Sequence, residues 1–551
     1  MRALRLALPA LLALCAVALL MPAKPGAQEQ ERQRRPNIVM LMTDDQTLAS
    51  LSVMGNVREL LGKRGTTFER SFVSLSLCCP SRATFLTGQY AHSHRVLGNK
   101  PPEGGYDKLD TREWLPTWLQ RAGYRTAHIG KFLNGYDAGD GVPPGWTEWY
   151  GSVDPSTYRF YGYTLNENGT LRSYGADRNP AFYSSDFYSR RASELITRVA
   201  PDPQPFFLSV AYLAPHSGAP RDPDDRRGVN SPSPAPRHRD RFAGTPLPQP
   251  PSFNESDVSD KPAHIRNRRP IGAPRARAIE ENYRQRLESL LAVDEGVASI
   301  IQTLRDTGEL ENTLVLFTSD NGFFHGEHRL ASGKVLAYEP SIRVPLLMRG
   351  PGVPSGARRR QLVTNADIAP TILDAAGARP AGRVQDGRSL LPLLRDGRRE
   401  WGRDLLFEGV GTTFDAIRTY RYKLIQHASG EQELYDLERD PHELQSLHAD
   451  PRLASVRGQL ARRLAKLKDC SGRACRAHPK PLLRLLRAGA SCQARVGSRR
   501  VERVDFRSRR YASDRRAPFR ARVAGSTLRV RVTTDTGSVV TLDRRLPRAC
   551  R

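Results

Sequence analysis

The sequence predicts an α/β fold in which polar side chains gather at one edge of a parallel sheet. Three apolar runs support this prediction, at residues 37–42, 204–212 and 313–317. Each run is continuous, as is typical of strands that are buried on both faces, and each is followed by polar residues. Open α/β sheets bind their ligands just beyond the carboxyl ends of the strands. We therefore expect a functional site where these three runs end.

The stretches around these runs predict the remaining layers. Apolar residues repeat at helical spacing over residues 278–305, which predicts a helix with one buried face. Residues 220–274 are rich in Pro, Arg and Asp, which indicates a long surface excursion. We expect a mixed sheet sandwiched by helices, within a catalytic domain at 36–395.

Two smaller units are predicted after the main domain. Residues 396–470 contain short strand-like pieces at 422–425 and 433–435 and a helix near 453–467, which indicates a small α+β unit. Residues 476–551 are expected to form a basic, disulfide-containing β appendage. Within it, alternating apolar and polar residues suggest an immunoglobulin-like arrangement.

The first 27 residues are predicted to be a signal peptide. Arg2 and Arg5 precede an apolar run at 6–21, and Gly26-Ala27 offers a cleavage site before a polar stretch. The run is short for a membrane span, although an uncleaved anchor stays open. We expect a secreted or cell-envelope protein.

The net charge of +27 is concentrated near the C-terminus, because residues 476–551 hold 21 Lys/Arg against 5 Asp/Glu. Such a basic tail can attract polyanions, for example sulfated glycans. A general Arg-rich composition of the whole chain is an equal alternative. Nucleic acid is not expected as a partner.

The seven cysteines divide into three groups. Cys15 leaves with the signal peptide, and the neighbours Cys78 and Cys79 are poorly placed to bridge each other. An even set near the C-terminus predicts two disulfides in an exported protein, with three pairings possible: Cys470, Cys475, Cys492 and Cys550.

Cys78 opens the most informative segment, Cys-Cys-Pro-Ser-Arg-Ala-Thr-Phe-Leu-Thr-Gly at 78–88. Pro80 and Ser81 favour a helix start, and Gly88 favours its end. Cys78 would then lie just ahead of the helix N-terminus, where negative charge is stabilised, so an activated thiolate is one interpretation. A buried pair of structural cysteines is the other.

Oxygen donors follow two of the predicted strands. They are Asp44, Asp45, Asp320 and Asn321. Such donors without His or Cys suit Ca²⁺ or Mg²⁺ rather than zinc. Taken singly, each pair is better explained as a helix cap or a turn, which is the usual role of Asp and Asn at strand ends. Two other acidic residues, Asp294 and Asp367, are interpreted as structural.

The 78–88 segment resembles the sulfatase signature, Cys-x-Pro-Ser-Arg followed by Leu-Thr-Gly. The resemblance covers roughly residues 36–450 and implies an alkaline-phosphatase-like fold. It implies that a formylglycine-generating enzyme converts Cys78 to formylglycine, whose hydrated form attacks sulfur, and that Arg82 holds the diol oxygens. The family carries its metal at Thr-Asp-Asp-Gln and Thr-Ser-Asp-Asn-Gly, which implies one Ca²⁺ or Mg²⁺ bound by Asp44, Asp45, Cys78, Asp320 and Asn321.

Three further segments resemble the family. They are Gly130-Lys131-Phe132-Leu133-Asn134-Gly135, Ala214-Pro215-His216 and Gly333-Lys334 with Tyr338-Glu339. The resemblance implies that Lys131 and Lys334 clamp sulfate oxygens. It also implies that His216 or Lys334 protonates the leaving oxygen.

Leu133 points to one branch of the family, because many arylsulfatases carry His at this position. The Lys-Phe-Leu-Asn version is similar to the N-acetylglucosamine-6-sulfatases and heparan endosulfatases. The expected activity is hydrolysis of sulfate esters of an amino sugar or glycan. A phosphodiester or phosphonate monoester hydrolase that uses the same groups is one alternative, and a glycan-binding protein without turnover is another.

Overall fold

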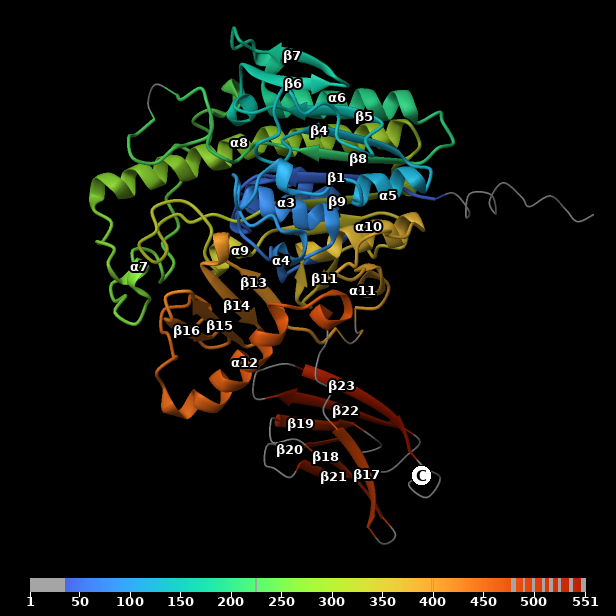
Figure 1. Ribbon diagram of the computed structural model, residues 1–551, viewed down its shortest axis with the longest axis vertical. Helices are drawn as coiled ribbons and strands as arrows, with labels where there is room; N and C mark the ends of the chain where they lie inside the picture. Colours follow the sequence, from blue (N-terminus) through green and yellow to red (C-terminus); the bar gives the residue numbers. More distant parts are fainter. Residues whose placement is uncertain are drawn as a thin grey trace, which may run out of the picture. The chain divides into compact units, whose positions relative to one another are not determined.

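A computed structural model describes residues 35–222, 225–397, 399 and 401–476, the strands between 482 and 545, and Leu546 (Figure 1). The predicted signal peptide at 1–27 lies outside the described residues. Among the described residues, no helix is both long and apolar enough to cross a membrane.

The largest element is a ten-stranded mixed sheet with the order β11-β2-β10-β9-β1-β8-β4-β5-β6-β7. Its strands are β1 Asn37–Thr43, β2 Thr66–Phe68, β4 Arg125–Gly130, β5 Glu148–Ser152, β6 Tyr163–Glu167, β7 Thr170–Tyr174, β8 Phe206–Ala211, β9 Thr313–Ser319, β10 Leu346–Arg349 and β11 Ala357–Arg359. The three apolar runs form β1, β8 and β9, as predicted. β1 lies between the other two and pairs with both in parallel.

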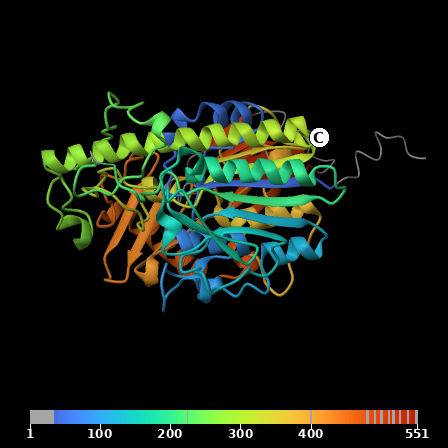
Figure 2. The same cartoon turned by 90° about the horizontal axis from the view of Figure 1, so that it is seen from above.

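Helices cover both faces of this sheet (Figures 1 and 2). On one face lie α6 Ser184–Val199 and α8 Ala273–Asp306, and on the other lie α3 Cys78–Thr87, α5 Leu115–Arg121 and α10 Ile368–Ala376. β1 serves both apolar cores, because Met40 packs in one and Leu41 in the other. The predicted sandwich and the predicted long helix are therefore confirmed.

A second, antiparallel sheet follows the main one in sequence. It consists of β13 Leu405–Glu408, β14 Phe414–Arg418, β15 Tyr422–His427 and β16 Gln432–Asp436. The helix α12 Ala454–Leu467 packs Leu460 and Leu464 in the same apolar cluster as Leu424 and Leu434. The strand-like pieces and the helix expected here are confirmed.

The C-terminal stretch forms two small antiparallel sheets, as expected for a β appendage. One has the order β17-β18-β21, and the other has the order β20-β19-β22-β23. Their bounds are β17 Leu482–Ala488, β18 Ser491–Gly497, β19 Val501–Arg507, β20 Tyr511–Asp514, β21 Phe519–Val523, β22 Thr527–Thr534 and β23 Val539–Arg545. Residues of both sheets, among them Val496 and Val530, share one apolar core. The immunoglobulin-like comparison and the domain boundaries stay predictions.

One disulfide is formed in the C-terminal cysteine set, between Cys470 and Cys475. Cys550 and the side chain of Cys492 lie outside the described residues, so the second expected disulfide stays a prediction.

His92 binds three segments together near this disulfide. Its Nδ1 lies 2.8 Å from Glu408 Oε1 on β13, and its Nε2 lies 2.8 Å from the carbonyl oxygen of Cys470. Burial alone would lower the pKa of His92, but the hydrogen bond and the charge of Glu408 raise it to about 9. Both ring nitrogens then donate, which is possible only for the imidazolium.

Asp294 and Asp367 also have structural roles, as predicted. Asp294 accepts hydrogen bonds from the backbone N–H groups of Asn56 and Val57. Asp367 caps its own turn at Thr364 and forms a fully buried ion pair with Arg403.

The raised pKa of His92 predicts a pH-dependent contribution to stability. An ordinary histidine pKa of 6.5 rises to about 9 in the folded chain, so the contribution is complete below pH 6.5 and is lost as the pH rises through 9. The shift corresponds to about 3 kcal/mol at most. We expect His92→Gln to lower the melting temperature clearly at pH 6 but little at pH 10. Equal losses at both pH values would contradict the assignment.

Candidate active site

Four polar side chains meet at the carboxyl ends of two neighbouring strands. Asp44 and Asp45 follow β1, and Asp320 and Asn321 follow β9. Because Thr43 of β1 pairs in parallel with Ser319 of β9, the polar residues that follow the two strands lie at the same edge of the sheet. The backbone of Asp45 is left-handed, with φ 67°, which turns the chain sharply after the strand.

Hydrogen bonds tie these residues together. The backbone N–H of Asp45 donates to Asp320 Oδ1 at 3.1 Å, and Asn321 Nδ2 donates to Asp45 Oδ1 at 2.6 Å. All four side chains are buried. Asn321 Oδ1 has no hydrogen-bond partner among the described residues, which leaves one buried oxygen available to a ligand.

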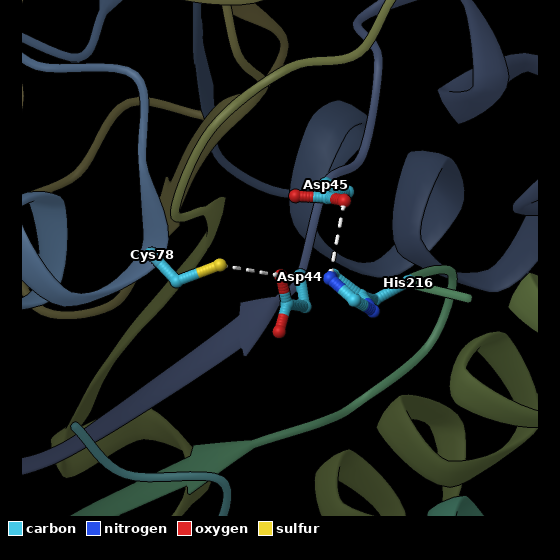
Figure 3. Close-up of side chains that lie close together, drawn as sticks. All are labelled: Asp44, Asp45, Cys78 and His216. Carbon is cyan, nitrogen blue, oxygen red and sulfur yellow. Dashed lines mark hydrogen bonds and ion pairs between the residues drawn. The ribbon is translucent and has the colours of Figure 1, made fainter. Parts of the chain in front are cut away.

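Cys78 begins α3 and reaches the same place from a different segment (Figure 3). Its Sγ lies 3.5 Å from Asp44 Oδ1 and 3.1 Å from Lys334 Nζ. The helix ends at Gly88, which is left-handed with φ 71° as a helix-ending glycine should be. Cys78 is thus the first helical residue, where we expected it just ahead of the helix.

The interpretation of Cys78 as an activated thiolate is wrong for the unmodified side chain. Burial, followed by the nearby charge of Asp44, raises the pKa of the Cys78 thiol to about 12. The neighbouring ammonium groups of Lys131 and Lys334 act in the opposite direction but do not overcome burial. An unmodified Cys78 is therefore a neutral thiol at physiological pH.

Three cations compensate the buried carboxylates. Arg82 Nε donates to Asp320 Oδ2 at 2.8 Å. Lys131 Nζ contacts Asp44, and Lys334 Nζ contacts Asp45. The Arg82 Nη1 also donates to the backbone carbonyl of Lys131 at 2.8 Å, so α3 and the end of β4 are held together at the site.

The buried carboxylates differ in the direction of their pKa shifts. Burial would raise the pKa of Asp44, but Lys131, His216 and Arg82 hold it well below its usual range. Asp45 behaves alike: burial would raise its pKa, but Lys334, His216 and Arg286 together lower it. Asp320 differs, because burial and the charge of Asp44 raise its pKa to about 6.

His216 reaches the site from the loop after β8. Its Nε2 lies 3.6 Å from Asp45 Oδ2 (Figure 3), and its Nδ1 donates to the carbonyl oxygen of Ser217 at 2.6 Å. Burial lowers the pKa of His216 to about 4, so the ring is neutral at pH 7. With the proton on Nδ1, the Nε2 that faces the site is an acceptor.

The side chains present fit a hard divalent cation. Asp44, Asp45, Cys78 and His216 can each place one ligand atom within 4.8 Å of the others. Asp320 is not in that set, although its carboxylate accepts a hydrogen bond from the backbone N–H of Asp45. The carboxylate oxygens and the unpartnered Asn321 Oδ1 are the donors that Ca²⁺ and Mg²⁺ prefer. The structure thus brings the predicted site residues together, while their individual roles stay predictions.

Arg286 and Tyr158 belong to the same neighbourhood but did not emerge from the sequence. Arg286 is buried in α8, donates to the backbone carbonyl of Asp45 and stacks on the Phe323 ring. The signal for Arg286 was available, since it lies four residues before Leu290 on the buried stripe of the helix. The ring of Tyr158 lies 4.5 Å from Lys131 Nζ and 4.9 Å from the His216 ring, and no pattern in the sequence indicates this.

Lys423 connects the second sheet to the segment that follows Lys334. Its ammonium is fully buried and donates to the carbonyl of Ala337 and to Glu443 Oε1, each at 2.7 Å. It also pairs with Glu339 at 3.1 Å. The segment that carries Lys334 is therefore anchored at its far end by β15.

Comparison with known proteins agrees with this geometry. Residues 36–378 match the sulfatase family, and residues 326–470 match the family described as N-sulphoglucosamine sulphohydrolase, C-terminal. The chain is 32% identical over 503 residues to N-acetylglucosamine-6-sulfatase of Homo sapiens, with 80% of this chain and 86% of that protein covered. It is 36% identical over 364 residues to a putative extracellular sulfatase Sulf-1 homolog of Caenorhabditis elegans, which covers 65% of this chain but only 49% of that relative.

A solved structure, described as a complex with its substrate D-glucosamine-2-N,6-O-disulfate, shares the fold. It superposes with a TM-score of 0.64 over 79% of this chain and 97% of that chain, at 23% identity. The expected alkaline-phosphatase-like α/β fold is confirmed. Because the family match covers more than half of the sequence, the chain belongs to the sulfatase family and is a sulfuric ester hydrolase.

Proposed function

We propose that this chain is an exported sulfatase that removes sulfate from 6-sulfated amino sugars of glycans, with Cys78 as formylglycine and one bound Ca²⁺ or Mg²⁺. The observation that carries the proposal is the position of Cys78. It lies at the N-terminus of α3, within 3.5 Å of a carboxylate of the oxygen cluster and 3.1 Å of a lysine ammonium. A nucleophile at this point meets both the metal ligands and the groups that bind an anion.

The side chains suggest how a sulfate group would be held. Lys131 is buried, and Lys334, which is nearly buried, lies 3.1 Å from Cys78 Sγ. Burial would lower the pKa of each lysine, but the neighbouring acidic groups together raise it, with Asp44 foremost for Lys131 and Asp45 for Lys334. Both therefore stay charged and can bind two sulfate oxygens. Arg82 holds Asp320 and the Lys131 backbone in place, and its position beside Cys78 suits it to bind the oxygens of the modified residue.

Asp44, Asp45, Asp320 and Asn321 would hold the cation, with the modified residue 78 as a further ligand. When bound, a divalent cation polarises a sulfate oxygen and stabilises negative charge on the nucleophile. The same ion would also offset the charge of Asp44 and Asp45, whose partners include Lys131 and Arg82 for Asp44 and Lys334 and His216 for Asp45.

The proton for the leaving group has two possible sources. Lys334 is protonated and lies beside Cys78, whereas His216 is neutral until a nearby anion raises its pKa. A bound sulfate ester brings such an anion, and the Asp45 carboxylate at 3.6 Å would stabilise the imidazolium. We propose His216 as the donor to a sugar oxygen.

The substrate class follows from the relatives and from Leu133. Leu133 packs in the apolar core with Phe132, so the histidine of many arylsulfatases has no equivalent at this position. The N-acetylglucosamine-6-sulfatase relative supports a 6-sulfated amino sugar. The extracellular Sulf-1 relative and the apolar run at 6–21 support export. Maturation by a formylglycine-generating enzyme and contact of the basic tail with polyanions belong to the same proposal.

Cys78 is predicted to be formylglycine when the protein is made in a host that has the generating enzyme. Peptide mass spectrometry identifies the aldehyde directly. We expect Cys78→Ala to abolish turnover of an aryl sulfate, whereas Cys79→Ala keeps it, because Cys79 packs in the apolar core. An active protein with an unmodified Cys78 thiol would refute the mechanism, and faster turnover of an aryl phosphodiester would favour the phosphorus-ester alternative.

Metal binding is predicted to stabilise the folded chain. After treatment with a chelator, added Ca²⁺ or Mg²⁺ should raise the melting temperature of the unaltered protein. At a cation concentration of 100 times the Kd, the free energy of unfolding should increase by about 2.7 kcal/mol. Asp45→Ala should lose this increase, while the surface variant Asp137→Ala should keep it. If the folded Asp45→Ala protein responds to the cation as the parent does, the ligand assignment is wrong.

His216→Ala should separate two kinds of substrate. A phenol leaves readily as an anion, whereas a sugar alcohol needs a proton in the transition state, and a general acid contributes about 10²–10⁴-fold. We therefore expect a far larger fall in kcat for a sugar 6-sulfate than for an activated aryl sulfate. An equal fall on both substrates would assign His216 to sulfate binding, and no fall on either would remove it from the site.

A further inference from the structure

We infer that a cavity beside His216 receives the leaving sugar, and that its Arg221 recognises a second anionic group on that sugar. This inference rests on the proposed function. The cavity has a volume of about 490 Å³, within the roughly 300–1,000 Å³ typical of small-molecule sites. Its lining includes Tyr158, His216, Ser217, Arg221, Asn230 and Ser231.

The cavity and the Cys78 site share a wall. His216 lines the cavity, and its Nε2 lies 3.6 Å from Asp45 Oδ2 in the oxygen cluster. Tyr158 also lines it, with its ring 4.5 Å from Lys131 Nζ. A sulfate held between Lys131 and Lys334, with its bridging oxygen toward His216, therefore directs the remainder of the substrate into this cavity.

The lining suits a sugar. Tyr158 contributes an aromatic side chain to the wall, and its hydroxyl accepts a hydrogen bond from Asn134 Nδ2. The other side chains on the wall are mostly small and polar, and they can donate to or accept from hydroxyl groups. An aromatic side chain beside hydroxyl and amide groups suits a sugar ring, which has apolar C–H groups and a polar rim.

Arg221 sets the charge of the cavity. Its Nε lies 3.4 Å from Asp225 Oδ2, and its Nη2 donates to the carbonyl of Arg226 at 3.2 Å, so the guanidinium has a defined orientation. Asp225 is in turn fixed by Gln285 Nε2, which donates to its Oδ1 at 2.8 Å. None of the described residues that line the cavity is acidic. Asp225 compensates part of the Arg221 charge, and Arg221 is the cationic side chain that the described lining offers to a leaving group with a further sulfate or a carboxylate.

The test compares three substrates: N-acetylglucosamine 6-sulfate, glucosamine 2-N,6-O-disulfate, and a disaccharide of a uronic acid with N-acetylglucosamine 6-sulfate. A small aryl sulfate is the control. For Arg221→Gln we expect KM to rise about tenfold for at least one of the two sugars with a second anionic group, with kcat nearly unchanged. If KM rises for the disulfated sugar, the recognised group is a sulfate, and if it rises for the disaccharide, the recognised group is a carboxylate. KM for the monosulfated sugar and for the aryl sulfate should stay within twofold.

Two further variants complete the design. Arg221→Lys should recover part of the affinity because the charge remains, and Arg226→Gln should leave every KM unchanged, since this exposed neighbour does not line the cavity. The preference should weaken at high salt, as an exposed ion pair requires. If the unaltered enzyme hydrolyses the sugars and Arg221→Gln changes every KM equally or not at all, the role of Arg221 is refuted while the proposed function stands. If the unaltered enzyme hydrolyses only the aryl sulfate, the proposed sugar substrate itself is refuted, and this inference with it.

Discussion

The acidic groups at the ends of β1 and β9 are stable in a buried position only because their counter-charges are buried with them. Asp44 and Asp45 pair with Lys131 and Lys334, and Asp320 pairs with Arg82. Removal of one partner from a buried pair typically costs about 3–5 kcal/mol, because the remaining charge has no compensation. The same cations that make the cluster tolerable are those an anionic substrate needs, so binding and stability rest on one set of interactions.

Several elements of the fold position these acidic and basic side chains. Parallel pairing of β1 with β9 sets the level of the acidic residues, and α3 brings Cys78 and Arg82 above them. The second sheet contributes at a distance, because the buried ammonium of Lys423 fixes the backbone at Ala337, three residues after Lys334. The small sheet is therefore part of the support of the active site, even though none of its strands carries one of the predicted catalytic residues.

Much of this arrangement could be predicted from the sequence. Continuous apolar runs located β1, β8 and β9, and the polar residues after them located the site, because strand ends are a local property of the chain. Protonation states could not be predicted in this way: the neutral Cys78 thiol depends on burial and on Asp44, 34 residues away. Tyr158 was missed for a related reason, since its contact with Lys131 arises from the packing of a short 3-10 helix, Ser156–Tyr158, that has no characteristic sequence pattern.

The bond between the Asp45 backbone and the Asp320 carboxylate joins positions 275 residues apart. Closing a loop of this length costs conformational entropy, and a fold rich in contacts of this range folds more slowly than one built from local contacts. The N-terminal half of the chain, emerging first during synthesis, carries Asp44, Asp45, Cys78 and Lys131 but lacks Asp320 and Lys334. A product that ends before Lys334 therefore lacks part of the site, and enzymatic activity requires that β1 and β9, from distant parts of the chain, have paired.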